Sequence, residues 1–148
     1  MKVHKELYIL IGPLGSNKTM YSEAIAKLFN MESVFWAKIK QEGGTKGCLD
    51  LLRKSLSKAF SEFSYVLLDG FPTNKDEAIF LLEASKTLGY TIKCVIQLNI
   101  SLEKIFHNLK NRFVCNNCGV FYEDDLSFSD KNILNCPNCG VALTRFLF

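Results

Sequence analysis

Short unbroken apolar runs alternate along the chain with longer stretches whose apolar residues recur at helical spacing. The apolar runs predict strands over residues 7–11, 34–36, 65–68 and 91–98. The run at 7–11 suits a strand buried on both faces, and the run at 65–68 is also expected to be buried. The periodic stretches predict helices over residues 18–29, 49–60, 74–87 and 101–111. Strands that alternate with helices predict right-handed crossovers and a parallel sheet, and therefore an α/β fold.

Three details refine these elements. The glycine-rich residues 41–47 are expected to form a loop before the second helix. On the first predicted helix, Ile25, Leu28 and Phe29 share one apolar face. Cys94 lies within an apolar run, which predicts that it is a buried small hydrophobe.

Residues 12–19 read Gly-Pro-Leu-Gly-Ser-Asn-Lys-Thr and directly follow the first predicted strand. A glycine-bearing loop between a strand and a helix turns its backbone N–H groups around a phosphate, and the helix dipole and a lysine add positive charge. Asn17 stands where the P-loop pattern has its second glycine, and asparagine tolerates left-handed backbone better than most residues. The alternative is a chance glycine turn, but the predicted strand and helix around it favour nucleotide binding.

The loop and the end of the third predicted strand supply the candidate nucleotide-binding residues. Those in the loop are Gly12, Gly15, Ser16, Asn17, Lys18 and Thr19. Lys18 is expected to hold the β- and γ-phosphates, and Thr19 to reach magnesium. Asp69 ends an apolar strand, where a carboxylate can hold a magnesium ion, usually through water. A helix cap or turn cap is the alternative role for Asp69.

Four of the six cysteines form two Cys-x-x-Cys pairs, and seventeen residues separate the inner two. The pairs are Cys115 with Cys118 and Cys136 with Cys139. In a cytosolic chain such pairs hold a metal ion rather than disulfides, in a tetrahedral four-thiolate site. Structural zinc is favoured, and iron in a rubredoxin-like site is the alternative. A closed site of this kind leaves no open position for catalysis.

Length and net charge limit the number of domains and the kinds of partner that the chain is expected to have. The 148 residues suffice for one compact domain with a small inserted lobe. A net charge of +3 is too small to indicate nucleic acid or an anionic membrane as the partner. No apolar run approaches the roughly 20 residues that a membrane span needs. The charged N-terminus shows no secretory signal, so a cytoplasmic location is expected.

Arginine is scarce in this chain, with three residues against fifteen lysines. Two of the three, Arg112 and Arg145, flank the cysteine segment. Planar guanidinium groups suit the charge on a phosphoryl group in transfer, which favours a catalytic role for both. The alternative is that they are ordinary surface arginines.

Taken in order, these motifs resemble the adenylate kinase family in its zinc-lid form. The matching segments are residues 12–18, Leu-Asp-Gly-Phe-Pro at 68–72, residues 97–112 and the four-cysteine segment up to Arg145. The resemblance implies a P-loop fold with three α/β/α layers around the parallel sheet, and a small zinc-ribbon-like lid. It implies a core over 1–112 with a reduced monophosphate-binding segment, a lid over 113–145 and a C-terminal remnant at 146–148.

The implied reaction is reversible phosphoryl transfer from ATP to AMP with magnesium. By the same resemblance Lys18 contacts the transferred phosphate, and Arg112 and Arg145 match the arginines at the lid hinge. The four cysteines match the family's zinc ligands.

The chain departs from the family mainly on the acceptor side. Thr73 replaces the arginine after Asp-Gly-Phe-Pro, Glu77 replaces a glutamine that reads the adenine, and Asn108 replaces an arginine before the lid. A missing guanidinium can cost orders of magnitude in rate. The last strand and helix of the family core are expected to be absent after Phe148, and the exposed sheet edge to invite a protein partner.

Two hypotheses therefore remain open. The chain is an adenylate-kinase-like enzyme, or it is a degenerate homologue that binds nucleotide as a subunit of an assembly. A zinc ribbon that binds RNA is disfavoured by the modest charge and the few arginines.

Overall fold

The computed structural model describes residues 4–110, 112–118, 121–123 and 135–145. The chain divides into two compact units, one formed by residues 1–13 and 17–99 and the other by residues 14–16 and 100–148. The predicted C-terminal remnant at 146–148 lies outside the described residues.

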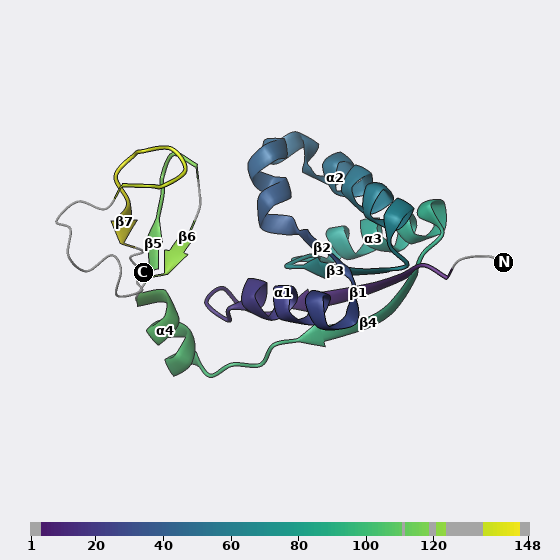
Figure 1. Ribbon diagram of the computed structural model, residues 1–148, viewed down its shortest axis with the longest axis horizontal. Helices are drawn as coiled ribbons and strands as arrows, with labels where there is room; N and C mark the ends of the chain where they lie inside the picture. Colours follow the sequence, from purple (N-terminus) through teal and green to yellow (C-terminus); the bar gives the residue numbers. More distant parts are fainter. Residues whose placement is uncertain (1–3, 111, 119–120, 124–134, 146–148) are drawn as a thin grey trace. The chain divides into compact units, whose positions relative to one another are not determined.

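The first unit alternates strands and helices, as the hydrophobic pattern predicts. Its elements are β1 (Glu6–Ile11), α1 (Lys18–Phe29), β2 (Glu32–Phe35), α2 (Trp36–Glu62), β3 (Tyr65–Asp69), α3 (Lys75–Leu88) and β4 (Thr91–Gln97). The four strands form one parallel sheet in the order β2-β3-β1-β4 (Figure 1). The predicted α/β fold with a parallel sheet is therefore confirmed.

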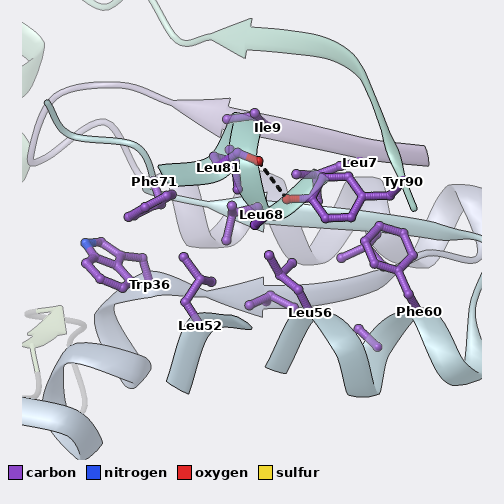
Figure 2. Packing of buried hydrophobic residues seen from close by; sticks show 14 of the residues in the cluster. Leu7, Ile9, Trp36, Leu52, Leu56, Phe60, Leu68, Phe71, Leu81 and Tyr90 are labelled. Carbon is purple, nitrogen blue, oxygen red and sulfur yellow. Dashed lines mark hydrogen bonds between the residues drawn. The ribbon is translucent and has the colours of Figure 1, made fainter. Parts of the chain in front are cut away.

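Helices cover the two faces of this sheet and make three layers. On one face Leu7 and Ile9 of β1 join a buried cluster with α2 and α3, seen in Figure 2. On the other face Leu10 of β1 packs with Ala26 of α1. Side chains alternate between the faces of a strand, so an unbroken apolar run supplies both layers.

Truncation of a leucine in the larger cluster is expected to destabilise the first unit. Leu52 is fully buried, so Leu52→Ala should lower the free energy of unfolding by about 2–5 kcal/mol, because it removes apolar contacts and leaves a cavity. Leu28→Ala is the matched control, because Leu28 is 77% exposed and its loss should cost about 0.5 kcal/mol or less. Urea denaturation measures both, and equal midpoints for the two variants would contradict this packing.

The apolar face predicted for α1 is only partly correct. The buried residues of α1 are Ser22 and Ala26, with Ile25 packed partly against them, whereas Leu28 and Phe29 are exposed. Small side chains let the helix lie close to the strands, and its contact stripe therefore follows Ser22 and Ala26. Leu28 and Phe29 lie outside that stripe.

The loop predicted at residues 41–47 is wrong, because these residues continue α2. A Cβ added to Gly43 would lie 2.9 Å from the Cα of Cys48 and 2.7 Å from Cδ1 of Leu51. In a straight helix, residues five apart are separated by about 7.5 Å along the axis. The close approach therefore marks a sharp bend, visible in Figure 1, that the missing side chain of Gly43 permits.

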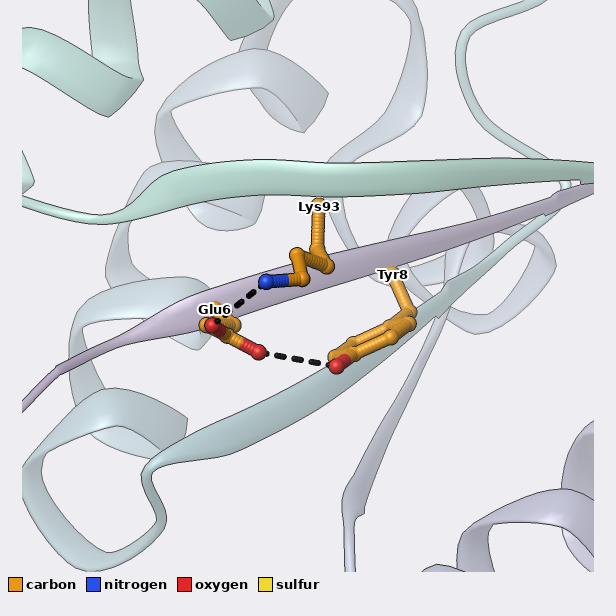
Figure 3. Close-up of polar contacts among 3 residues, drawn as sticks. All are labelled: Glu6, Tyr8 and Lys93. Carbon is orange, nitrogen blue, oxygen red and sulfur yellow. Dashed lines mark hydrogen bonds and ion pairs between the residues drawn. The ribbon is translucent and has the colours of Figure 1, made fainter.

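Cys94 is exposed rather than buried, because it lies on the edge strand β4, where Val95 is exposed as well. The register pairs Leu7 with Ile92 and Tyr8 with Cys94, so Lys93 is an extra residue in β4. Cys94 thereby lies beside Tyr8 at the edge of the sheet. Lys93 reaches Glu6, with 3.3 Å between Nζ and Oε1, and Glu6 also accepts a 2.8 Å hydrogen bond from Tyr8 (Figure 3).

The second unit contains α4 (Leu102–Lys110) and an antiparallel sheet with the order β6-β5-β7. Its strands are β5 (Arg112–Val114), β6 (Phe121–Glu123) and β7 (Thr144–Arg145). The Ser101 hydroxyl accepts a 3.3 Å hydrogen bond from the backbone N–H of Lys104 at the start of α4. Within the described ranges, no helix combines the length and the apolar character needed to cross a membrane.

Candidate nucleotide-binding and metal-binding sites

The predicted phosphate loop connects the carboxyl end of β1 to α1. Lys18 is the first residue of α1, and its ammonium donates hydrogen bonds to the carbonyl oxygens of Gly12 (2.8 Å) and Pro13 (2.9 Å). Asn17 adopts the left-handed conformation, with φ 58 and ψ 34, that asparagine tolerates better than most residues. The first turn of α1 carries no acidic residue, so the positive end of the helix dipole is not neutralised there.

Asp69 lies at the carboxyl end of β3 and is 5% exposed. Burial raises the pKa of its carboxyl above the ordinary value. The hydroxyls of Thr19 and Ser22 and the ammonium of Lys18 act in the opposite direction and favour the carboxylate. The structure therefore brings Lys18, Thr19 and Asp69 to one end of the parallel sheet.

The raised pKa predicts that the ionised carboxylate of Asp69 lowers the free energy of unfolding. The folded carboxyl holds its proton to higher pH than the unfolded one, so stability falls as pH rises from the ordinary pKa of aspartate through the folded pKa. Asp69→Asn should raise Tm near neutral pH by about 2–4 °C and weaken that pH dependence. The same substitution should weaken binding of Mg-ATP.

Asp50→Asn is the matched control, because Asp50 is exposed on α2. It should leave both Tm and nucleotide affinity unchanged. Calorimetric melting over a range of pH measures the first quantity, and titration with Mg-ATP measures the second. A lower Tm for Asp69→Asn together with unchanged affinity would contradict this description of the site.

Residues 14–16 of the loop belong to the second unit, where α4 holds them. Gly15 has a φ of +85, and a Cβ there would lie 2.8 Å from Cγ of Leu109. The side-chain amide of Asn108 donates a 2.8 Å hydrogen bond to the carbonyl oxygen of Gly15. Asn108 thus holds the loop itself. The sequence showed only that an arginine is replaced there and offered no sign of this contact.

Ser16 of the second unit suits a phosphate oxygen, and Thr19 and Asp69 of the first unit suit a magnesium ion. Ser16 is fully buried, and its hydroxyl has no hydrogen-bond partner among the residues that the structure describes. A phosphate oxygen would supply the missing acceptor. Hydroxyl and carboxylate oxygens, as in Thr19 and Asp69, are the ligands that magnesium prefers.

On the predicted acceptor side, Thr73 and Glu77 bind each other. The carboxylate of Glu77 accepts hydrogen bonds from the backbone N–H of Thr73 (2.6 Å) and from its hydroxyl (2.8 Å). The neighbouring Asn74 caps α3 by accepting a 2.9 Å hydrogen bond from the backbone N–H of Glu77. The carboxylate of Glu77 is thus held against Thr73, the residue at which the family resemblance implies an arginine.

The four predicted metal ligands gather in the second unit. The sulfur atoms of Cys115, Cys118, Cys136 and Cys139 all lie within 4.8 Å of one another. Zinc–sulfur bonds of about 2.3 Å place the sulfurs of a tetrahedral site about 3.8 Å apart, so the arrangement fits such an ion. After the last cysteine the chain turns at Gly140, with φ 75, and the backbone N–H of Gly140 donates to the carbonyl of Cys136.

Burial and hydrogen bonds shift the pKa values of these thiols in opposite directions. Burial raises the pKa of the Cys136 thiol, but the hydroxyl of Tyr122, 3.1 Å away, and backbone N–H groups outweigh burial and lower the pKa to about 6. The backbone N–H of Cys118 lowers the pKa of the Cys115 thiol, but burial and the thiol of Cys139 together outweigh it and raise that pKa to about 11. A bound divalent cation deprotonates its thiol ligands outright.

The two predicted catalytic arginines lie on adjacent strands of the second unit. Arg145 of β7 is opposite Phe113 of β5, and its guanidinium carbon lies 5.5 Å from the centre of the Phe113 ring. Arg112 directly precedes Phe113 on β5. The register therefore brings the two arginines to the same end of this sheet.

Comparison with known proteins identifies the family, although no family model matches the chain. The chain is 30% identical over 167 aligned positions to the adenylate kinase of Chlamydia caviae, with 97% of this chain and 74% of the relative covered. It is 30% identical to the adenylate kinase of Chlamydia abortus, with the same shares covered. It is 25% identical to that of Petrotoga mobilis, with 93% and 71% covered. The chain therefore belongs to the adenylate kinase family.

Proposed function

We propose that this protein is a cytoplasmic nucleoside monophosphate kinase that transfers a phosphoryl group reversibly between Mg-ATP and AMP. The observation that carries the proposal is the placement of the Lys18 ammonium, over the start of the phosphate loop, close to the buried Asp69. Similarity to proteins named adenylate kinase supports the same reaction.

Each residue of the nucleotide site has a distinct task in this reaction. The Lys18 ammonium exchanges its hydrogen bonds to the carbonyl oxygens of Gly12 and Pro13 for hydrogen bonds to phosphate oxygens. Its positive charge then lies next to the phosphoryl group in transfer. Thr19 and Asp69 would hold magnesium, which neutralises charge on the phosphates when it is bound. The backbone N–H groups of the loop orient the donor.

We also propose that residues 113–145 act as a metal-clamped lid on a core formed by residues 1–112, in which the monophosphate-binding segment is reduced. Zinc held by the four cysteines would have a structural role. Arg112 and Arg145, at the two ends of the lid, would stabilise charge on the transferred group.

A coupled assay of ADP formation from ATP, with several nucleoside monophosphates as acceptors, tests the proposal. Turnover is expected with AMP and magnesium and should be lost when magnesium is chelated. ATP binding without ADP formation from any acceptor would contradict it.

The contacts on the acceptor side favour a second candidate, a catalytically degenerate subunit that binds nucleotide within an assembly. The carboxylate of Glu77, held against Thr73, would repel an acceptor phosphate. Edge strand β4 exposes Cys94 and Val95, where the predicted protein partner would bind. Native mass measurements that find a stable partner, together with absent turnover, would favour this candidate.

A further inference from the structure

One peptide of the phosphate loop, between Gly15 and Ser16, is held by a side chain of α4. The side-chain amide of Asn108 donates a 2.8 Å hydrogen bond to the carbonyl oxygen of Gly15, and both residues belong to the second unit. The peptide is trans, so its C=O and N–H groups point in opposite directions. Because Asn108 holds the carbonyl toward α4, the backbone N–H of Ser16 points away from α4.

Glycine at position 15 allows the same peptide to turn over. Gly15 has a φ of +85, and a residue without Cβ offers little steric resistance to rotation of the peptide that follows it. The residue is packed tightly against α4, since an added Cβ would lie 3.2 Å from the carbonyl oxygen of Ile105. Packing against α4 therefore fixes where Gly15 lies, whereas the hydrogen bond from Asn108 fixes the direction of its carbonyl.

The direction of this carbonyl decides whether the peptide attracts or repels a phosphate. A backbone N–H attracts a phosphate oxygen, and a carbonyl oxygen repels it. In the observed orientation Ser16 offers its N–H beside a buried hydroxyl that has no hydrogen-bond partner among the described residues. The reversed orientation would turn that N–H toward α4 and place the Gly15 carbonyl oxygen on the opposite side. The observed orientation is therefore the one that suits an anion.

We propose that Asn108 is a positioning residue that keeps the peptide between Gly15 and Ser16 in its phosphate-binding orientation. This inference rests on the proposed kinase function and concerns the donor ATP, whose phosphates the loop would bind. Asn108 acts through the N–H of Ser16 rather than by contact with the phosphate. A neutral amide suits this role, because it donates to a carbonyl oxygen and carries no negative charge that would repel the donor.

Asn108→Leu keeps the branched shape of the side chain but removes the N–H donor. Its affinity for Mg-ATP should fall about tenfold, the scale for one hydrogen bond to a charged group, and its affinity for inorganic tripolyphosphate should fall equally. Asn99→Leu is the matched control, because Asn99 is exposed and lies outside both the loop and α4. Calorimetric titration measures these affinities, and the control should bind both ligands as the unaltered protein does.

Asn108→Asp distinguishes the orientation of the peptide from simple packing. Aspartate has nearly the shape of asparagine, but its carboxylate accepts hydrogen bonds instead of donating them. It should therefore accept the N–H of Ser16 and hold the reversed orientation, so that affinity for Mg-ATP falls further than in Asn108→Leu. Asn99→Asp changes the net charge equally and should bind normally. A smaller loss in Asn108→Asp than in Asn108→Leu would overturn the inference, because packing alone predicts that order.

Nuclear magnetic resonance reports the orientation in the unaltered protein. Tripolyphosphate should move the backbone amide proton of Ser16 downfield, because this proton forms a hydrogen bond to a charged oxygen. In Asn108→Asp the same proton should already lie downfield before any ligand is added, since the carboxylate accepts it. A Ser16 amide proton that saturating tripolyphosphate leaves unmoved in the unaltered protein would overturn the inference.

ATP binding and ADP formation together separate this inference from the proposed function. Equal affinities for Mg-ATP in Asn108→Leu and the unaltered protein overturn the role of Asn108 and leave the kinase function standing. The expected order of affinities without ADP formation from any acceptor overturns the kinase function and leaves the role of Asn108 standing. Absence of Mg-ATP binding to the unaltered protein overturns both.

Discussion

Lys18→Met is expected to reduce ADP formation at least about a hundredfold, the usual scale for loss of one charged or hydrogen-bonding group that stabilises a transition state. The Lys18 ammonium is the cation that the structure places at the start of the phosphate loop, within hydrogen-bond distance of Gly12 and Pro13. Methionine keeps the length and apolar stem of the side chain but carries no charge. The loss should therefore appear in the rate and in ATP affinity, with little effect on Tm.

Lys27→Met provides the comparison for Lys18→Met. Lys27 lies in the last turn of the same helix α1 and is exposed, so this substitution changes the net charge equally without altering the loop. Its rate should match that of the unaltered protein. Comparable rates for the two variants in the coupled assay would show that Lys18 does not contact the transferred group.

The strand–helix order was predictable because local sequence determines it. The run at 7–11 has no polar break, and the structure buries it on both faces between α1 and the α2–α3 layer. The left-handed backbone of Asn17 was also predictable, because Asn17 stands where the loop pattern has a glycine. The spacing of the four cysteines likewise predicted that their sulfur atoms gather in one cluster, as they do in the structure.

The errors arose where tertiary contacts override local preference. Glycines in 41–47 indicated a loop, but close packing of Gly43 on Cys48 needs glycine within a bent helix. Cys94 is exposed because β4 is an edge strand, and the extra residue Lys93 pairs Cys94 with Tyr8; no pattern in the sequence indicates either feature.

Cys136→Ser is expected to remove the metal from the second unit and to unfold the segment that it clamps. Cys136 is 2% exposed and supplies one of four sulfurs, and a structural metal contributes directly to folding free energy. Metal content should fall from about one equivalent per chain to nearly none. Plasma mass spectrometry measures this and distinguishes zinc from iron. Limited proteolysis should then cleave within residues 112–145 first.

Cys94→Ser makes the same chemical change at an exposed cysteine outside the cluster and should retain the metal. Acidification should mimic Cys136→Ser in the unaltered protein, because protons compete with the metal for thiolate sulfur, so occupancy at about pH 5 should be below that at about pH 8. The unfolding transition of residues 17–99 should persist in both cases, since their buried clusters include none of the four cysteines. Full metal content in Cys136→Ser would show that the four sulfurs do not share an ion.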